Sequence, residues 1–112
     1  MIISTLKIFP APTKEQEVLD ILLSVRGPTQ AALGCLECCI YREHDEERAI
    51  VYLERWQSRK MMLGHIRSSL YPRVLKALEL SERQPEIFFH EISATEGIEL
   101  IERERSSMVG TR

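Results

Sequence analysis

The chain has 112 residues, of which 44% are hydrophobic and 29% are charged, and the net charge is −2. This length and composition are typical of one globular domain with a single core, and they exclude a largely disordered chain. Positive charge is not concentrated anywhere, so we expect no nucleic-acid partner. No apolar run approaches membrane-spanning length and no leader precedes the first apolar residues, so we expect a cytoplasmic protein without a membrane partner.

The first quarter of the sequence predicts a strand and a helix. Alternating, β-branched residues indicate a strand over residues 2–9, which prolines then end. A helix is expected from about Lys14 to Arg26, with Thr13 as its N-cap and an end before Gly27-Pro28. Its buried stripe follows helical spacing and consists of Val18, Ile21, Leu22 and Val25.

The middle of the sequence predicts a β-hairpin whose two strands are apolar on both faces. These strands cover Cys35 to Arg42 and Ala49 to Trp56, and a polar, acidic loop over 43–48 joins them. A sheet wetted on one side would alternate more cleanly, so we expect a cover on each face. The three cysteines all lie between residues 35 and 39, which favours free buried thiols over a disulfide framework.

The last third predicts two helices and a fourth strand. Ser58 is a suitable N-cap for a helix that ends near Ser68. Pro72 suits the first turn of the next helix, whose expected buried stripe is Val74, Leu75 and Leu78. Residues 86–92 alternate and indicate the fourth strand.

The order strand, helix, strand, strand, helices, strand is the split βαβ pattern of ferredoxin-like α+β domains. We therefore expect a four-stranded antiparallel sheet with helices on one face. The apolar second face predicts a homodimer formed through the sheet, which is a dimeric α+β barrel. We place the domain at residues 1–94 and treat 95–112 as a partly flexible C-terminal extension, in which residues 98–101 form a short helix or a strand added to the partner's sheet.

The hairpin and the helix after it carry a family resemblance. Residues 41–45 are Tyr-Arg-Glu-His-Asp, residues 50–56 are Ile-Val-Tyr-Leu-Glu-Arg-Trp, and His65 follows about one helix later. A hairpin that ends in Glu-x-Trp and is followed by a histidine resembles the antibiotic biosynthesis monooxygenase (ABM) family of dimeric α+β barrels. The start of the second strand, Gly34-Cys35-Leu36, is also similar, and the resemblance covers about residues 2–92.

The resemblance implies an apolar pocket between sheet and helices, where some members oxidise phenol-like, quinol-like or anthrone-like substrates with O₂ and without a metal, flavin or other cofactor. Such chemistry needs a base to deprotonate the substrate and a wall that excludes water. His65 is the candidate catalytic residue, as base or substrate anchor. A small hydrophobic or aromatic molecule is the expected ligand, and the candidate substrate-binding residues are Tyr52, Glu54, Trp56, Met61, Met62 and Tyr71.

Structural explanations of the same residues remain open at this point. Trp56 can be a core anchor, and His65 can be a hydrogen-bonded structural residue. Glu54 can pair with an arginine such as Arg42 across the hairpin instead of acting in a pocket. No histidine and carboxylate have the close spacing of a metal site. For the whole protein, the alternative to a monooxygenase is a non-catalytic dimeric module that binds a small ligand or serves as a structural partner.

Overall fold

The computed structural model of the protein describes residues 1–46 and 48–110; residue 47 of the acidic loop and residues 111–112 of the expected extension lie outside the described residues. The elements in chain order are β1 (Ile2–Ile8), η1 (Pro12–Lys14), α1 (Glu15–Gln30), β2 (Cys35–Arg42), β3 (Ile50–Trp56), α2 (Arg59–Ile66), α3 (Tyr71–Glu79), β4 (Glu86–Glu91) and α4 (Ile98–Gly110).

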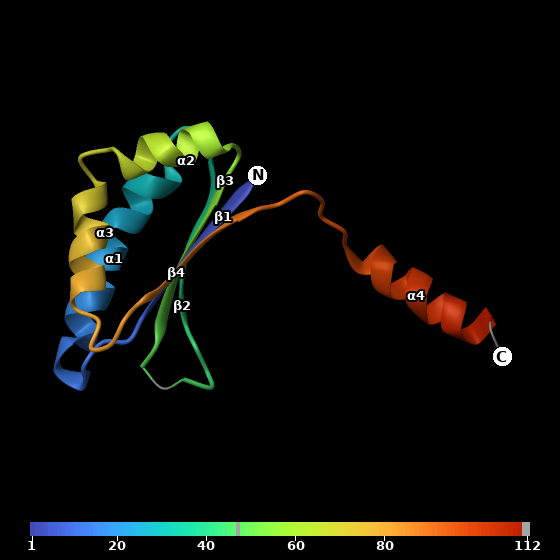
Figure 1. The fold of residues 1–112 in the computed structure, drawn as a ribbon, viewed down its shortest axis with the longest axis horizontal. Coiled ribbons are helices and arrows are strands. Elements are labelled where there is room, and N and C mark those ends of the chain that lie inside the picture. Colours follow the sequence, from blue (N-terminus) through green and yellow to red (C-terminus); the bar gives the residue numbers. More distant parts are fainter. Residues whose placement is uncertain (47, 111–112) are drawn as a thin grey trace.

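The four strands form one antiparallel sheet in the order β2-β3-β1-β4. Helices α1, α2 and α3 all lie on the same side of this sheet (Figure 1). The ferredoxin-like split βαβ arrangement with helices on one face is therefore confirmed. We call the side that carries the three helices the covered face and the other side the open face.

The core lies between the covered face and the helices. Every second residue of β1 and β3 is buried, because successive side chains of a strand point to opposite faces. Two clusters of buried side chains fill this space. The larger one contains Leu6, Ile8, Val18, Leu22, Val25, Cys38, Ile50, Tyr52, Tyr71, Val74 and Ala77. The smaller one contains Ile2, Trp56 and Met62.

Helix α1 differs from its prediction at both ends. It continues to Gln30 with Pro28 inside it, so the expected end before Gly27-Pro28 is wrong. The last turn is held by the sheet: Thr29 is fully buried, and the Gln30 amide donates to the Cys38 carbonyl oxygen at 3.0 Å. These contacts outweigh the one backbone hydrogen bond that proline removes. The predicted N-cap is also wrong, because Thr13 lies in η1 and α1 begins without a side-chain cap.

The two later helices follow the sequence more closely. The Ser58 hydroxyl caps α2 as predicted, accepting a hydrogen bond from the Met61 backbone N–H at 3.3 Å. In α3 the buried stripe consists of Tyr71, Val74 and Ala77. Leu75 was expected in this stripe but is 47% exposed, because α3 is rotated so that positions three apart face the core.

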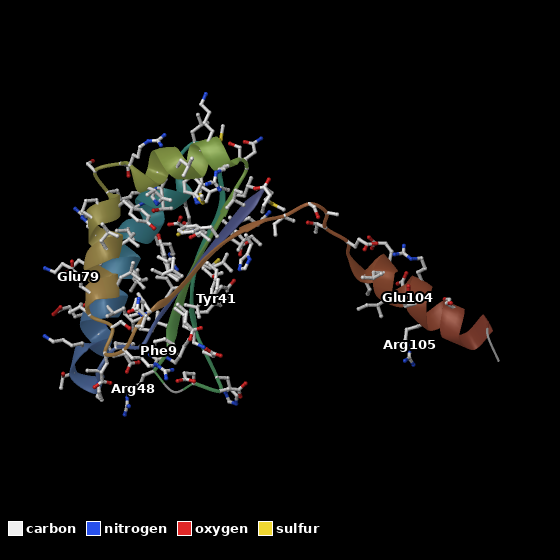
Figure 2. All side chains as sticks on the ribbon, in the orientation of Figure 1. Phe9, Tyr41, Arg48, Glu79, Glu104 and Arg105 are labelled. Atoms are coloured by element: carbon white, nitrogen blue, oxygen red, sulfur yellow. The ribbon has the colours of Figure 1, made fainter. Side chains whose placement is uncertain are left out.

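Two further expectations concern the cysteines of β2 and the C-terminal segment. All three cysteines are free thiols, as predicted, but only Cys38 is buried, whereas Cys35 and Cys39 are half-buried. Residues 98–110 form helix α4, which is the helical alternative for this segment, and α4 projects away from the sheet (Figure 1). Figure 2 shows Glu104 and Arg105 on this helix, far from the side chains that fill the space between sheet and helices. No helix in the described part of the chain is long and apolar enough to span a membrane.

Candidate functional site

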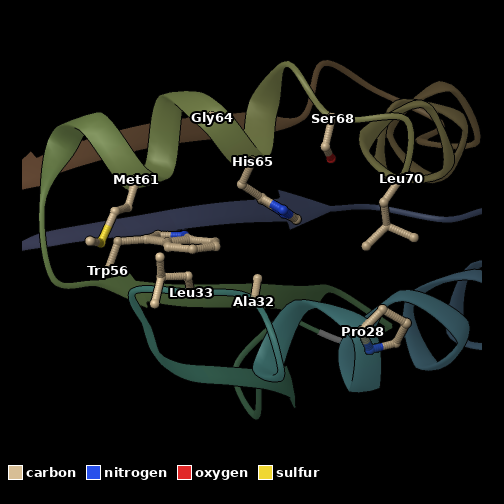
Figure 3. A pocket seen from close by; sticks show the side chains of 9 residues that line it. All are labelled: Pro28, Ala32, Leu33, Trp56, Met61, Gly64, His65, Ser68 and Leu70. Atoms are coloured by element: carbon tan, nitrogen blue, oxygen red, sulfur yellow. The ribbon is translucent and has the colours of Figure 1, made fainter.

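A pocket of about 360 Å³ lies at the α2 end of the covered face (Figure 3). Its walls come from the end of α1 and the turn after it, the end of β3, helix α2 and the loop between α2 and α3. This volume is at the lower end of the range for small-molecule sites, about 300–1,000 Å³. The lining residues are mostly apolar and consist of Pro28, Ala32, Leu33, Trp56, Met61, Gly64, His65, Ser68 and Leu70.

One wall of the pocket depends on a close approach between Gly34 and Met61. Gly34 has φ +86°, and a Cβ atom added to it would lie 2.0 Å from the Met61 sulfur. The Gly34 carbonyl also accepts a hydrogen bond from the Gln57 backbone N–H at 2.8 Å, which joins the start of β2 to the end of β3. Only glycine gives both this backbone conformation and this close contact. The sequence motif at Gly34 therefore has a packing role beside the pocket.

A buried carboxylate lies behind the pocket wall. Glu54 is 2% exposed, and its Oε1 accepts a hydrogen bond from Trp56 Nε1 at 2.9 Å. Its Oε2 lies 3.2 Å from His65 Nε2. Glu54 and Trp56 share the covered face because residues two apart on a strand point the same way. Both oxygens of this carboxylate are thus satisfied by side chains of the site, as a buried carboxylate requires.

The expected pairing of Glu54 with Arg42 is therefore wrong. The hairpin register places Arg42 opposite Ile50, whereas Glu54 lies opposite Cys38, four residue pairs further along the two strands. Arg42 instead forms an ion pair with Glu15 at the start of α1. The register, which the sequence alone leaves open, decides which of the two arrangements forms.

His65 is held between two aromatic rings. Its ring centroid lies 4.9 Å from that of Trp56 and 5.4 Å from that of Tyr71, which meets it edge-on. A carboxylate accepts hydrogen bonds, so this network assigns the proton of the neutral imidazole to Nε2. Among the described residues nothing forms a hydrogen bond with Nδ1. A neutral His65 in this tautomer therefore has a free lone pair on Nδ1, and its ring points into the pocket (Figure 3).

The two tyrosines near the site are held in their neutral form. Burial, and to a smaller extent the charge of Glu54, raises the pKa of Tyr71 to about 12. Burial also raises the pKa of Tyr52 far above its ordinary value, and its hydroxyl is engaged with Cys38 Sγ at 3.2 Å and Thr29 Oγ1 at 3.5 Å. Neither phenol can serve as a base near neutral pH. His65 is therefore the best placed base at the pocket.

The structure puts the seven candidate site residues in three places. His65, Trp56 and Met61 line the pocket. Glu54 and Tyr71 contact His65 from within the core. Met62 packs behind Trp56 in the smaller cluster, and Tyr52 belongs to the larger cluster, away from the pocket.

Sequence reasoning missed six of the lining residues. Pro28, Ala32 and Leu33 follow the point where the first helix was expected to end, so no pattern connected them with the site. Gly64, Ser68 and Leu70 lie on α2 or just after it. For Ser68 there was a usable signal, since it stands three residues after His65, which is the spacing of one helical turn.

The described residues contain no group of three or more His, Cys, Asp or Glu side chains arranged to hold a metal ion. The pocket-lining residues with unused side-chain hydrogen-bonding atoms in the described part of the chain are His65 and Ser68, while the indole N–H of Trp56 is directed to Glu54. The arrangement is suited to accepting a proton from a mostly apolar ligand.

Fold and pocket together define a small α+β protein with a mostly apolar cavity between a sheet and its covering helices. The family model described as antibiotic biosynthesis monooxygenase matches residues 1–77, and the chain therefore belongs to this family. Membership supports a monooxygenase or small-molecule-binding role. No curated protein matches the sequence.

Several solved structures share the fold. A candidate antibiotic biosynthesis monooxygenase from Deinococcus radiodurans has a TM-score of 0.79 at 17% identity, covering 88% of this chain and 98% of that one. Rv0793 from Mycobacterium tuberculosis has a TM-score of 0.77 at 22% identity, covering 86% and 98%. A conserved protein from Methanosarcina mazei has a TM-score of 0.74 at 25% identity, covering 80% and 90%.

Proposed function

We propose that this chain is a cofactor-independent monooxygenase that oxidises a small aromatic substrate of the phenol, quinol or anthrone type. The proposal rests on the hydrogen bonding of His65 and on its position at the pocket. Its Nε2 is bound to a buried carboxylate, its Nδ1 has no hydrogen-bond partner in the described part of the chain, and its ring borders a pocket whose other walls are mostly apolar.

In the first step, His65 Nδ1 takes the acidic proton of the bound substrate. Glu54 stabilises the imidazolium that forms, because its carboxylate already lies 3.2 Å from Nε2. The Trp56 indole N–H fixes the other carboxylate oxygen, so the pair needs little rearrangement when the proton moves. Proton abstraction by a positioned histidine contributes about 10²–10⁴-fold to a rate.

In the second step, the deprotonated substrate reacts with O₂. For an anthrone-like substrate, electrons of the delocalised carbanion reduce O₂ and a new C–O bond forms. His65 returns its proton to give a hydroperoxide, and loss of water from this adduct leaves a carbonyl group. One O₂ is consumed, and one oxygen atom enters the product while the other leaves as water. The substrate supplies all the electrons, and the apolar wall keeps bulk water from the intermediate.

The other candidate residues have supporting roles in this proposal. Trp56 and Met61 provide the apolar surface against which an aromatic ring packs. Glu54 and Tyr71 position His65. Met62 supports Trp56 from the core behind the pocket, and Tyr52 has no direct role in it, because it lies in the larger cluster outside the pocket lining.

Oxygen uptake by the metal-free protein tests the proposal. The substrates are a panel of quinols, anthrones and naphthols, and the controls are a reaction without protein and the His44→Ala variant, in which an exposed histidine is removed. We expect uptake with the wild type and with His44→Ala, and a loss of about 100-fold or more in His65→Ala. Uptake no faster than the protein-free control across the panel would contradict the proposal.

The alternative is a binding module without turnover, which the small number of polar groups at the pocket favours. Anaerobic calorimetry with the same panel separates the two functions, because it measures occupancy of the pocket without any reaction. Heat of binding together with a lack of oxygen uptake would assign the chain to this alternative.

We also propose that a second copy of the chain covers the open face. Tyr41 is 49% and Phe88 is 54% exposed on this face, which is a large apolar exposure for a sheet. Sedimentation should give twice the chain mass of 13.0 kDa. Phe88→Glu should give monomers, whereas Leu75→Glu, on the outer surface of α3, should not. A monomeric wild type would contradict this part of the proposal.

We further propose that residues 1–94 are the functional unit and residues 95–112 are an appendage. The support is that residues 98–107 of α4 are exposed along their whole length. A chain truncated after residue 94 should keep its ligand affinity and its unfolding midpoint. A clear loss of either would assign the extension a role in the unit.

A further inference from the structure

Ser68 has a buried hydroxyl group without a hydrogen bond to any residue that the structure describes. Its Oγ is inaccessible to water and has no partner among the described residues. The residue lines the pocket, and Figure 3 shows its side chain between His65 and Leu70, on the side that faces the cavity. An unpaired buried hydroxyl is unusual in a folded protein, because it loses its hydrogen bonds to water without replacement.

The backbone places Ser68 beside His65. The Ser68 N–H donates to the His65 carbonyl oxygen at 3.0 Å, which extends α2 by one tight turn. Residues three apart on such a turn lie on the same side, with Cβ atoms about 5–6 Å apart. The two hydrogen-bonding groups, His65 Nδ1 and Ser68 Oγ, therefore belong to the same wall of the pocket.

The opposite wall has a different character. Pro28, Ala32 and Leu33 lie across the cavity from α2 (Figure 3) and offer only apolar side chains. A ligand that is complementary to both walls has its polar atoms along the edge that faces His65 and Ser68, and only hydrocarbon along the opposite edge. Two oxygen atoms on opposite edges would leave one of them against the apolar wall, where the loss of its hydrogen bonds to water is uncompensated.

We propose that Ser68 is a specificity-determining residue, which hydrogen-bonds a second oxygen substituent on the same edge of the aromatic ligand that His65 contacts. The inference rests on the proposed function of the pocket and narrows its substrate class to aromatics with two oxygens on neighbouring or peri carbons. Rotation about the single Cα–Cβ bond turns the hydroxyl toward such a ligand, and the new hydrogen bond removes the penalty of the unpaired state.

Three naphthalene ligands test this edge specificity. They are 1,8-dihydroxynaphthalene, with both oxygens on one edge, 1,5-dihydroxynaphthalene, with oxygens on opposite edges, and 1-naphthol, with one oxygen. Affinities are measured by calorimetry without oxygen, so that no ligand is oxidised. We expect the wild type to bind the 1,8-isomer about tenfold more tightly than the other two, as one well-made hydrogen bond allows.

The variant Ser68→Ala should lose this preference, with affinity for the 1,8-isomer falling about tenfold and affinity for 1-naphthol unchanged. Ser69→Ala is the matched control, since Ser69 is the exposed neighbour, and it should retain the preference. Thermal unfolding of both variants checks that neither change disturbs the fold.

Several outcomes would overturn the inference. These are equal affinities of the wild type for the 1,8- and 1,5-isomers, no effect of Ser68→Ala, or an equal loss for all three ligands, which would indicate general damage to the pocket. Binding that is independent of Ser68 would overturn this inference and leave the proposed function standing. A failure of the wild type to bind any of the ligands would count against both.

Discussion

The two ends of the covered face are built from the same strand but are packed differently. At one end, Ile50 and Tyr52 of β3 lie in the larger cluster, where α1 and α3 close over the sheet. Further along β3, Glu54 and Trp56 meet the short helix α2, and a pocket remains. We call these regions the core end and the pocket end. Two helices that pack against each other fill the space over a sheet, whereas α2 and its loops leave room for a ligand.

The polar groups of the two ends differ as well. At the core end, the hydroxyl of Tyr52 meets Cys38 and Thr29, so neutral groups satisfy one another. At the pocket end, a carboxylate is buried with a histidine, and Nδ1 of His65 and Oγ of Ser68 have no hydrogen-bond partner among the residues that the structure describes. Burying ionisable groups is unfavourable unless they are well paired. Under the proposed function, the pocket end gives up stability for chemistry, and each prediction below tests this contrast between the two ends.

The largest effect is expected for Trp56→Ala. Trp56 is fully buried, and its loss removes a large apolar side chain and leaves one oxygen of Glu54 without its donor. We expect the free energy of unfolding to fall by about 3–5 kcal/mol in urea titrations. Leu75→Ala, on the exposed side of α3, should change it by less than about 0.5 kcal/mol. A loss below about 1 kcal/mol for Trp56→Ala would show that the pocket end contributes little to the fold.

The next effect concerns the wall of the pocket. Gly34→Ala forces a side chain onto a positive φ and against Met61, so we expect a loss of about 2 kcal/mol and weaker ligand binding. Gly27→Ala is the control, because an added Cβ meets no atom within 4 Å there and α1 should gain about 0.5–1 kcal/mol. Equal effects of the two changes in urea titrations would contradict this account.

Alkaline pH should destabilise the larger cluster, which contains both Cys38 and Tyr71. Burial raises the pKa of Cys38 and of Tyr71 to about 12, so both groups stay protonated in the folded chain when they ionise in the unfolded one. The unfolded state then binds fewer protons, and stability is lost as pH rises from about 9 toward 12. Tyr71→Phe should reduce this loss by about 1–2 kcal/mol. Urea unfolding curves at pH 8 to 11 measure the free energy of unfolding at each pH. A free energy that does not change over this range would be inconsistent with neutral buried groups.

The smallest effect is expected for Tyr52→Phe. The change removes one hydroxyl from the contacts with Cys38 and Thr29, which should cost about 1 kcal/mol. Ligand affinity should stay the same, since Tyr52 lies outside the pocket lining. Calorimetry measures the ligand affinity. A clear loss of affinity would contradict the view that the core end and the pocket end act independently.

Much of the fold was predictable because it depends on local patterns. Alternation along β1 and β3, the hydroxyl cap at Ser58 and the proline of α3 each act over a few residues, and the structure contains all of them. The end of α1 was not predictable in this way. Local rules favour a stop before Gly27-Pro28, but burial of Thr29 against the sheet carries the helix onward.

The candidate site likewise has some features set by local sequence patterns and others set by tertiary contacts. The sequence by itself determined that Glu54 and Trp56 share one face of a strand and that His65 follows on a helix, because these relations come from strand and helix periodicity. Only the tertiary structure decided that Glu54 pairs with His65 and that the Ser68 hydroxyl is buried at the pocket. Each of these depends on groups from separate elements, whose positions are set by strand register and helix packing over the whole domain.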